Sequence, residues 1–243
     1  TRPSFIEMAP FLYQESYGST QIRGNADLQN GYNYNIDLRY ELFEKNGDML
    51  SITAYYKHLK APIERVQTLS GGSAVHSFRN ADNGMATGVE IEFRKEIVKD
   101  LRFGVNGSYM YTNVKLPEGG AYTNSQRALQ GASPYLANAD LTYSPAFSND
   151  RQLSVALLYN LQGPRIHSVG ISGLGDIKQQ PVHTLNFTGS YRFNRRFAVK
   201  LQVNDLLNQD ILFKQEVPTT GDKVEVERFR KGTGFEVGFS YDL

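Results

Sequence analysis

Two glutamates and four histidines are the side chains of this sequence whose types could support chemistry. Glu90 and Glu92 are two residues apart, so a strand would place both carboxyl groups on one face, as general acid–base catalysis can use. Their segment alternates regularly, and we interpret them as polar contacts of a strand rather than as catalytic groups. The histidines lack metal-ligand spacing, and we expect them to be solvated loop residues: His58, His76, His167 and His183.

Other signatures of catalysis or cofactor binding are missing from the sequence. Cysteine is absent, which excludes a disulfide framework, a thiolate metal site and a cysteine nucleophile. No Gly-x-Ser-x-Gly motif occurs, and the glycine-rich stretches at 71–73 and 170–175 do not join a strand to a helix, as phosphate-binding loops do. We therefore predict no enzyme activity, no cofactor and no metal site.

The composition leaves only two classes of protein open. The 243 residues carry 26 Lys and Arg against 25 Asp and Glu, and this near-neutral balance argues against a nucleic-acid partner. Mean hydropathy is −0.44 and no run of 18 apolar residues occurs, which excludes membrane-spanning helices. The 15 Tyr, 14 Phe and 22 Gly fit either a soluble all-β protein or a membrane β-barrel.

Alternation of apolar and polar residues predicts nine strands. In the first, Ile36 and Leu38 alternate with Asp37 and Arg39. One face of the nine strands has no charged residue, and the other carries all their charges, which suits either solvent or the wet lumen of a large barrel. The predicted strands span residues 33–42, 50–57, 87–94, 101–111, 135–143, 153–160, 185–193, 197–204 and 235–243.

The connections between these strands favour the membrane barrel. Short connections alternate strictly with long ones, as the periplasmic turns and extracellular loops of outer-membrane barrels do. Aromatic residues lie beside both kinds of connection, like the girdles at the two membrane interfaces. The short connections are 43–49, 95–100, 144–152 and 194–196, and the long ones are 58–87, 112–134, 161–184 and 205–234. The sequence thus predicts an all-β, antiparallel, up-and-down transmembrane β-barrel segment.

Nine strands cannot form a complete bacterial barrel, because single-chain barrels of this kind have even strand numbers. An open sheet in lipid would also leave two unpaired edges. We therefore expect about nine or ten strands of a larger barrel. Residues 1–32 are expected to form an extracellular loop region that leads into the segment, and residues 33–243 the C-terminal strands and loops.

Several short motifs, in order along nearly the whole chain, resemble those of TonB-dependent outer-membrane receptors of the Bacteroidetes type. They include Thr1-Arg2-Pro3-Ser4-Phe5, Arg23-Gly24-Asn25, Asp37-Leu38-Arg39-Tyr40-Glu41, Pro62-Ile63-Glu64, Gly88-Val89-Glu90-Ile91-Glu92, Leu129-Gln130-Gly131, Ser133-Pro134-Tyr135 and Asn204-Asp205-Leu206-Leu207-Asn208. One departure is Lys231-Gly232-Thr233, where such receptors often have Pro-Gly-Arg.

This resemblance implies a 22-stranded barrel in the outer membrane of a Gram-negative bacterium, with a plug domain in its lumen. The complete receptor would import a scarce nutrient: a siderophore, haem, cobalamin, a glycan or a peptide. Its partners would be outer-membrane lipid, its own plug domain, the TonB complex and a small nutrient ligand. This chain includes neither plug nor TonB-contact segment, and the charged face would contact the plug through Asp37, Arg39, Glu41, Glu90, Glu92 and Arg94.

The last predicted strand fits the pattern of an outer-membrane assembly signal. That pattern is polar-x-Gly-x-x-hydrophobic-x-hydrophobic, and the matching residues are Glu236, Gly238, Tyr241 and Leu243. An unpaired amphipathic edge strand is a template for strand addition, so the barrel-assembly machinery is the expected partner.

A nutrient would bind in the three long loops before residue 185, where Tyr122 and Arg127 are the candidate anchors. Two other interpretations stay open. The chain could belong to an outer-membrane barrel of another class, such as an adhesin, an assembly protein or an enzyme, and an upstream plug sequence would exclude these. It could also be a soluble all-β binding module, which would fold without detergent.

Overall fold

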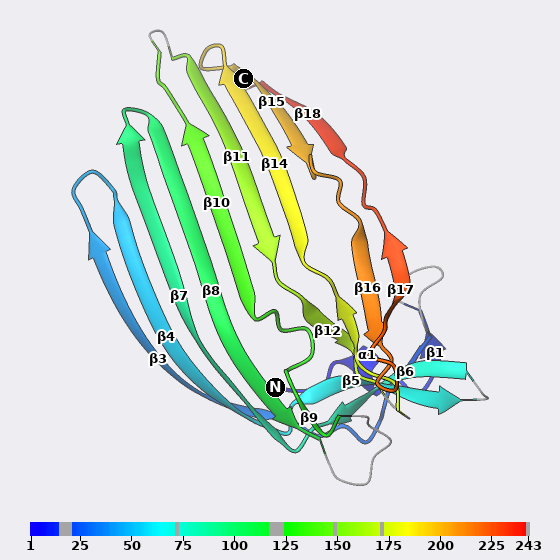
Figure 1. Ribbon diagram of the computed structural model, residues 1–243. Coiled ribbons are helices and arrows are strands. Elements are labelled where there is room, and N and C mark those ends of the chain that lie inside the picture. The colour runs from blue at the N-terminus through cyan, green and yellow to red at the C-terminus, as the bar shows by residue number, and fades with distance from the viewer. Residues whose placement is uncertain (15–20, 71–72, 117–123, 148–149, 171–172, 242–243) are drawn as a thin grey trace.

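Nine long antiparallel strands form one curved sheet (Figure 1). The computed structural model describes residues 1–14, 21–70, 73–116, 124–147, 150–170 and 173–241. Along the sheet the strands follow one another in chain order, and all nine predicted strands are confirmed. They are β3 (Tyr32–Phe43), β4 (Met49–Lys60), β7 (Asn83–Val98), β8 (Leu101–Lys115), β10 (Tyr135–Tyr143), β11 (Gln152–Gln162), β14 (Val182–Arg192), β15 (Phe197–Asn204) and β18 (Gly234–Tyr241).

Tight turns join the strands at the upper end of Figure 1, where the C-terminal end also lies. Between β3 and β4, Gly47 has a φ of +86°, a left-handed conformation that glycine adopts without steric cost. Its amide donates to the carbonyl of Glu44 at 3.1 Å, and Glu44 donates to Asp48 at 2.9 Å. At another turn the rings of Phe193 and Phe197 stack at 5.3 Å between centroids, within the predicted girdle.

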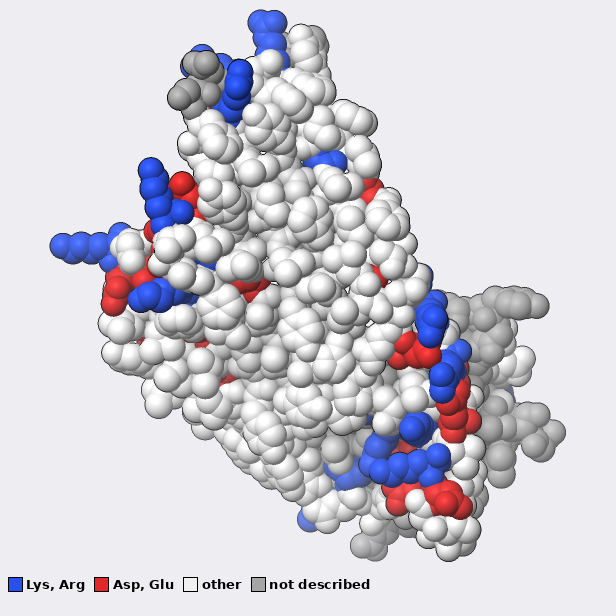
Figure 2. Space-filling model, turned by 45° about the horizontal axis from the view of Figure 1, so that its top comes forward, with Lys and Arg blue, Asp and Glu red and all other residues white. Residues whose placement is uncertain are grey.

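The register of the sheet keeps apolar residues on one face from strand to strand. A single row crosses six strands through directly paired residues, namely Phe103, Leu141, Leu157, Phe187, Val203 and Phe235. Many side chains of this face are exposed, with Ile36 at 73% and Leu38 at 76%. Figure 2 shows a broad face over the sheet in which charged side chains gather at the margins. We name it the uncharged face.

The opposite face is polar, and its rows are equally continuous. Asn138 donates to Asn106 at 2.7 Å, and Asn160 donates to Asn138 at 2.5 Å, which forms an asparagine ladder over β8, β10 and β11. Ion pairs join residues two apart on one strand: Arg39 with Glu41 at 2.7 Å, and Arg94 with Glu92 at 2.5 Å. We name this the polar face.

The long connections contain further strands that the alternation of residues does not predict. One small sheet has the order β1-β2-β6-β5 and another the order β12-β13-β16-β17. These strands are β1 (Leu12–Tyr13), β2 (Ile22–Arg23), β5 (Ile63–Ser70), β6 (Ser73–Asn80), β12 (Arg165–Ser168), β13 (Ile177–Gln179), β16 (Ile211–Glu216) and β17 (Lys223–Phe229). Helix α1 (Phe5–Met8) and strand β9 (Gln126–Arg127) complete the elements. We name the two small sheets with α1 and β9 the cap.

The cap lies at the end of the long strands opposite the tight turns (Figure 1). Val66 and Val169 form a parallel bridge that joins its two sheets. A buried apolar cluster lies at this junction and contains Ala81, Val114, Leu116, Ile166 and Val169. Residues 1–32, expected to be an extracellular loop region, supply α1, β1 and β2 to the cap. No helix in the described part of the chain is long and apolar enough to cross a membrane.

A kink separates β15 from β16, within the motif Asn204-Asp205-Leu206-Leu207-Asn208. Asp205 and Asn208 both have positive φ, at 55° and 43°. Asn208 donates its amide to the carbonyl of Asp205 at 3.1 Å, and the side chain of Asn186 accepts from the Asp205 amide at 2.9 Å. The side chain that bonds the kinked backbone thus comes from the neighbouring strand β14.

A lysine placed on the uncharged face tests the facing of the strands. We expect Leu201→Lys to lower the free energy of folding into lipid vesicles by roughly 2–4 kcal/mol, because the ammonium group would enter hydrocarbon. The matched change Gln202→Lys lies on the polar face and should cost far less. Urea titration of the full-length protein in vesicles measures both. Equal costs would contradict the assigned facing.

Candidate binding site in the cap

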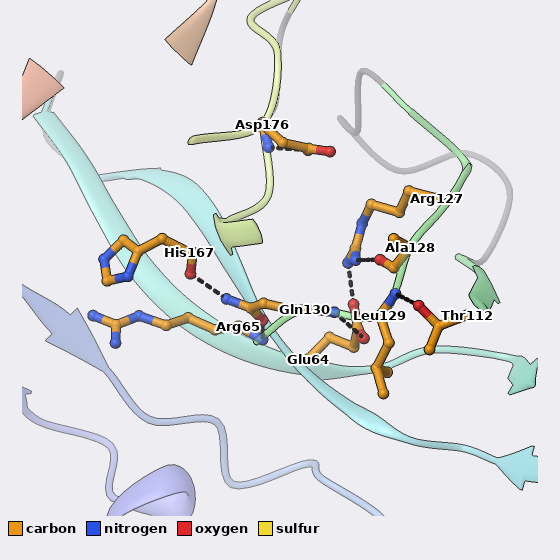
Figure 3. A network of polar contacts seen from close by, with 10 residues as sticks. Glu64, Arg65, Thr112, Arg127, Ala128, Leu129, Gln130, His167 and Asp176 are labelled. Atoms are coloured by element: carbon orange, nitrogen blue, oxygen red, sulfur yellow. Dashed lines mark hydrogen bonds and ion pairs between the residues drawn. The ribbon is translucent and has the colours of Figure 1, made fainter. Parts of the chain in front are cut away.

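A buried ion pair joins two cap segments that are far apart in the sequence. Glu64 on β5 and Arg127 on β9 have side chains that are 1% and 3% exposed, and Arg127 donates from Nη2 to a Glu64 carboxylate oxygen (Figure 3). Arg127 also donates from Nη1 to the carbonyl of Ala128 at 3.0 Å. Burial raises the pKa of the Glu64 carboxyl, and the positive charge of Arg127 opposes that rise. Each partner therefore compensates a charge that would otherwise be costly to bury.

Gln130 extends this contact to β12 (Figure 3). Its Oε1 accepts from the backbone amide of Arg65 at 2.5 Å, and its Nε2 donates to the carbonyl of His167 at 2.5 Å. One amide side chain thus bonds the backbones of β5 and β12 together. The amide of Leu129 donates to Thr112 Oγ1 at 3.0 Å, which fastens the same segment to β8.

The expectation of loop histidines is wrong, because His58, His167 and His183 lie on β4, β12 and β14, and His76 is a buried member of the cap. It lies on β6 and is 2% exposed. Arg65 Nε donates to Nδ1 of His76 at 3.0 Å, so the single proton of the neutral imidazole is on Nε2. This Nε2 lies 3.0 Å from Ser168 Oγ, to which it can donate. Burial, with the nearby Arg65 and His167, lowers the pKa of His76 to about 4.

Two hollows lie in and beside the cap. The first, of about 580 Å³, is lined by residues that include Arg127, Arg165, Asp176 and Lys178. The second, of about 560 Å³, is lined by residues that include Arg2, Asn33, Glu64, Gln130 and His167. Arg165 and Ile166 line both hollows, which places the Glu64–Arg127–Gln130 network between them.

Of the two predicted nutrient anchors, Tyr122 and Arg127, the structure describes only Arg127. Tyr122 lies outside the described residues. Arg127 lines the first hollow, but it is largely buried and its charge is compensated by Glu64, so it anchors the cap as well. Its contact with a nutrient stays a prediction.

The six predicted plug-facing residues all lie on the polar face, as the register shows. Three of them line a hollow of about 300 Å³: Arg39, Glu90 and Glu92. Their contact with a plug stays a prediction. Of the predicted assembly signal, Glu236, Gly238 and Tyr241 lie on β18, which pairs with β15, and Leu243 lies outside the described residues.

Sequence reasoning missed the buried polar residues of the cap, chiefly His76, Ser168 and Asp176. Glu64 and Gln130 appeared only within family-like motifs, without a role. Among the described residues, no group of three or more His, Cys, Asp or Glu could hold a metal ion. The arrangement offers hydrogen-bonding and charged groups around two cavities, which is the chemistry of ligand binding.

Comparison with known proteins agrees with this architecture. The profile of the outer membrane protein beta-barrel family matches residues 1–241. The chain belongs to this family. As a member of this family, it is a protein of the bacterial outer membrane, and its nine-stranded sheet is a piece of barrel wall. The uncharged face therefore contacts lipid. No curated protein matches the sequence significantly.

Solved structures of siderophore receptors resemble this family member in fold. A ferric enterobactin receptor variant from Pseudomonas aeruginosa, in complex with enterobactin, has 18% identity and a TM-score of 0.61, over 99% of this chain and 36% of that one. The ferric yersiniabactin uptake receptor from Yersinia pestis has 17% identity and a TM-score of 0.59, over 88% and 30%. A siderophore receptor from Acinetobacter baumannii has 16% identity and a TM-score of 0.58, over 91% of this chain and 33% of the receptor. The chain thus spans about a third of these receptors' length.

Removal of one partner from the buried ion pair tests its role in the cap. We expect Arg127→Met to destabilise the cap by about 3–5 kcal/mol, because the Glu64 carboxylate would stay buried without compensation. The double variant Glu64→Leu with Arg127→Met should cost less, because it buries no charge. Hydrogen exchange of the β5, β6 and β9 amides in the full-length protein measures both. Additive effects of the two changes would contradict the coupling.

The buried His76 predicts that the cap weakens in acid. The pKa of His76 is about 4 when folded and near 6.5 when unfolded, so its contribution is complete above pH 6.5 and is lost as the pH falls toward 4. This loss amounts to about 2 kcal/mol at pH 5. Protection factors of β6 amides at pH 7 and pH 5 measure it. His76→Gln should remove most of the difference in protection between pH 7 and pH 5. If this difference stays the same in the variant, other titrating groups cause the acid sensitivity.

Proposed function

We propose that this chain forms wall and cap of a TonB-dependent outer-membrane transporter that imports a scarce nutrient. The observation that carries the proposal is a folded cap with two hollows whose linings include charged side chains, held at one end of a membrane-spanning sheet. Likeness in fold to siderophore receptors over 88–99% of the chain supports it. So do the short motifs that resemble those of TonB-dependent receptors of the Bacteroidetes type.

In this proposal the two faces of the wall have different partners. The uncharged face contacts lipid, and the polar face contacts a plug domain that occupies the lumen. A small nutrient binds at the cap, and the TonB complex acts on a segment outside this chain. The barrel-assembly machinery recognises β18 during insertion. The chain itself catalyses no reaction.

Among nutrient classes, ferric siderophores are the first to test. Three similar structures are named as siderophore or ferric siderophore receptors. At 16–18% identity they share the fold alone, so haem, cobalamin, glycans and peptides belong in the same experiment.

Deletion of the gene in its host tests the proposal. We expect the deletion strain to lose growth on one limiting nutrient from a panel of ferric siderophores, haem, cobalamin, oligosaccharides and peptides. The full-length gene should restore growth only when TonB is present, because import needs energy from the inner membrane. Growth on an abundant nutrient that crosses porins is the control. Restoration without TonB would favour a barrel of another class.

A further inference from the structure

The wall has a gap at the cap end of β10, where this strand begins. Strand β10 begins at Tyr135, which pairs with Tyr109 of β8, whereas β8 continues to Lys115. On that side, strand pairing of β8 stops at Tyr109 and resumes only at Val114, which pairs with β9. Across the gap the amide of Met110 still donates to the carbonyl of Pro134 at 2.8 Å. On the other side of β10, the chain of β11 continues beyond Gln162 into β12.

The hollow of about 580 Å³ lies in this gap. Its lining takes residues 109–113 from β8, Pro134 from the start of β10, and residues 164–166 from β12 and the residue before it. Residues 126–128 and Asp176 contribute from the cap. The hollow therefore exists because β10 is shorter than the strands on both of its sides.

Positive charge exceeds negative charge in this lining. Arg127, Arg165 and Lys178 supply three cations, and Asp176 supplies the carboxylate of the lining; Glu64, which pairs with Arg127, lines the other hollow. Asp176 accepts the amide of Gly170 at 2.9 Å. Arg165 Nε donates to Gln179 at 2.7 Å, and within the described residues neither Arg165 nor Lys178 forms an ion pair.

The Nε of Arg127 is an independent sign of a missing partner. The side chain is 3% exposed, yet this nitrogen has no hydrogen-bond partner among the described residues. Buried polar atoms are almost always bonded, and a buried donor left alone is costly. Because Nε itself is inaccessible, an oxyanion in the hollow would act on the guanidinium through electrostatic attraction rather than through a hydrogen bond to Nε.

The hollow also lies at the level of the tyrosines on the uncharged face. Tyr109 and Tyr111 are in its lining and are 66% and 56% exposed. Tyrosines in this position mark the boundary between hydrocarbon and lipid headgroups. A ligand at this level can come from the membrane as well as from solution.

We propose that the hollow at the cap end of β10 binds an anionic phosphate group through Arg165 and Lys178. Guanidinium and ammonium groups are the side chains that bind phosphate best, and a partly enclosed site strengthens their attraction. The position beside the tyrosines favours a lipid headgroup as the carrier of the phosphate. The hollow is one of the two in which a nutrient is proposed to bind, but the phosphate site rests on Arg165 and Lys178, and its test does not depend on nutrient import.

Native mass spectrometry of the full-length protein in detergent tests the site with short-chain phosphatidic acid. We expect the wild-type protein to retain this lipid and the variant R165Q with K178Q to bind it at least tenfold more weakly. Diacylglycerol of the same chain length, which lacks the phosphate, should not be retained. Inorganic phosphate that binds with the same dependence on Arg165 and Lys178 would confirm the phosphate site and assign it to a soluble ligand.

Two further variants keep the result interpretable. The matched control K223Q with K231Q removes two exposed positive charges that are outside the lining, and it should retain the lipid fully. If the double variant of the site misfolds, Lys178→Glu reverses the charge of an exposed side chain and serves in its place. Equal retention by the wild type and the site variant, or an equal loss in the control, would overturn the proposal.

Discussion

The constraint on which this structure depends is that a backbone in lipid must satisfy its hydrogen bonds within the protein. Nine strands pair in chain order, and the registers align the uncharged faces of neighbouring strands, as in the row from Phe103 to Phe235. A slip by one residue would turn a whole strand over and bring charges such as Glu90 and Glu92 into hydrocarbon. The two faces therefore fix the register of the strands, because any other register would bring charged side chains into the hydrocarbon.

Beyond the span of the large sheet, polar side chains add to the backbone pairing. Within each small sheet the cap strands pair through their backbones, and polar side chains bond one cap segment to another. Gln130 bonds the backbones of β5 and β12, and the Glu64–Arg127 pair joins β5 to β9. Such a network is stable only when each member has its partner, so the long connections form one packed body rather than independent loops.

The same contrast explains what the sequence could predict. Period-two alternation identified all nine wall strands, because lipid requires an uncharged face and the lumen tolerates charge. It failed for the cap, where β5 buries Glu64 and β6 buries His76, so a rule that places polar residues outside misreads both strands. Alternation alone also placed the six predicted plug-facing residues on one shared face, the polar face. The partner of Arg127 was not predictable, since Glu64 is 63 residues away and the contact depends on the fold of two connections.

Strand lengths locate the membrane on this wall. A tilted transmembrane strand needs about 9–11 residues, and β10 has nine. The wall is interrupted at the start of β10, beside Tyr135, and at Asp205, directly after β15. Unpaired backbone cannot face lipid, so both interruptions must lie beyond the hydrocarbon. The membrane boundary therefore runs close to Tyr135 on β10 and to Asn204 on β15, and the cap with its hollows stands above it. Polar networks can form there because water and headgroups replace the hydrocarbon.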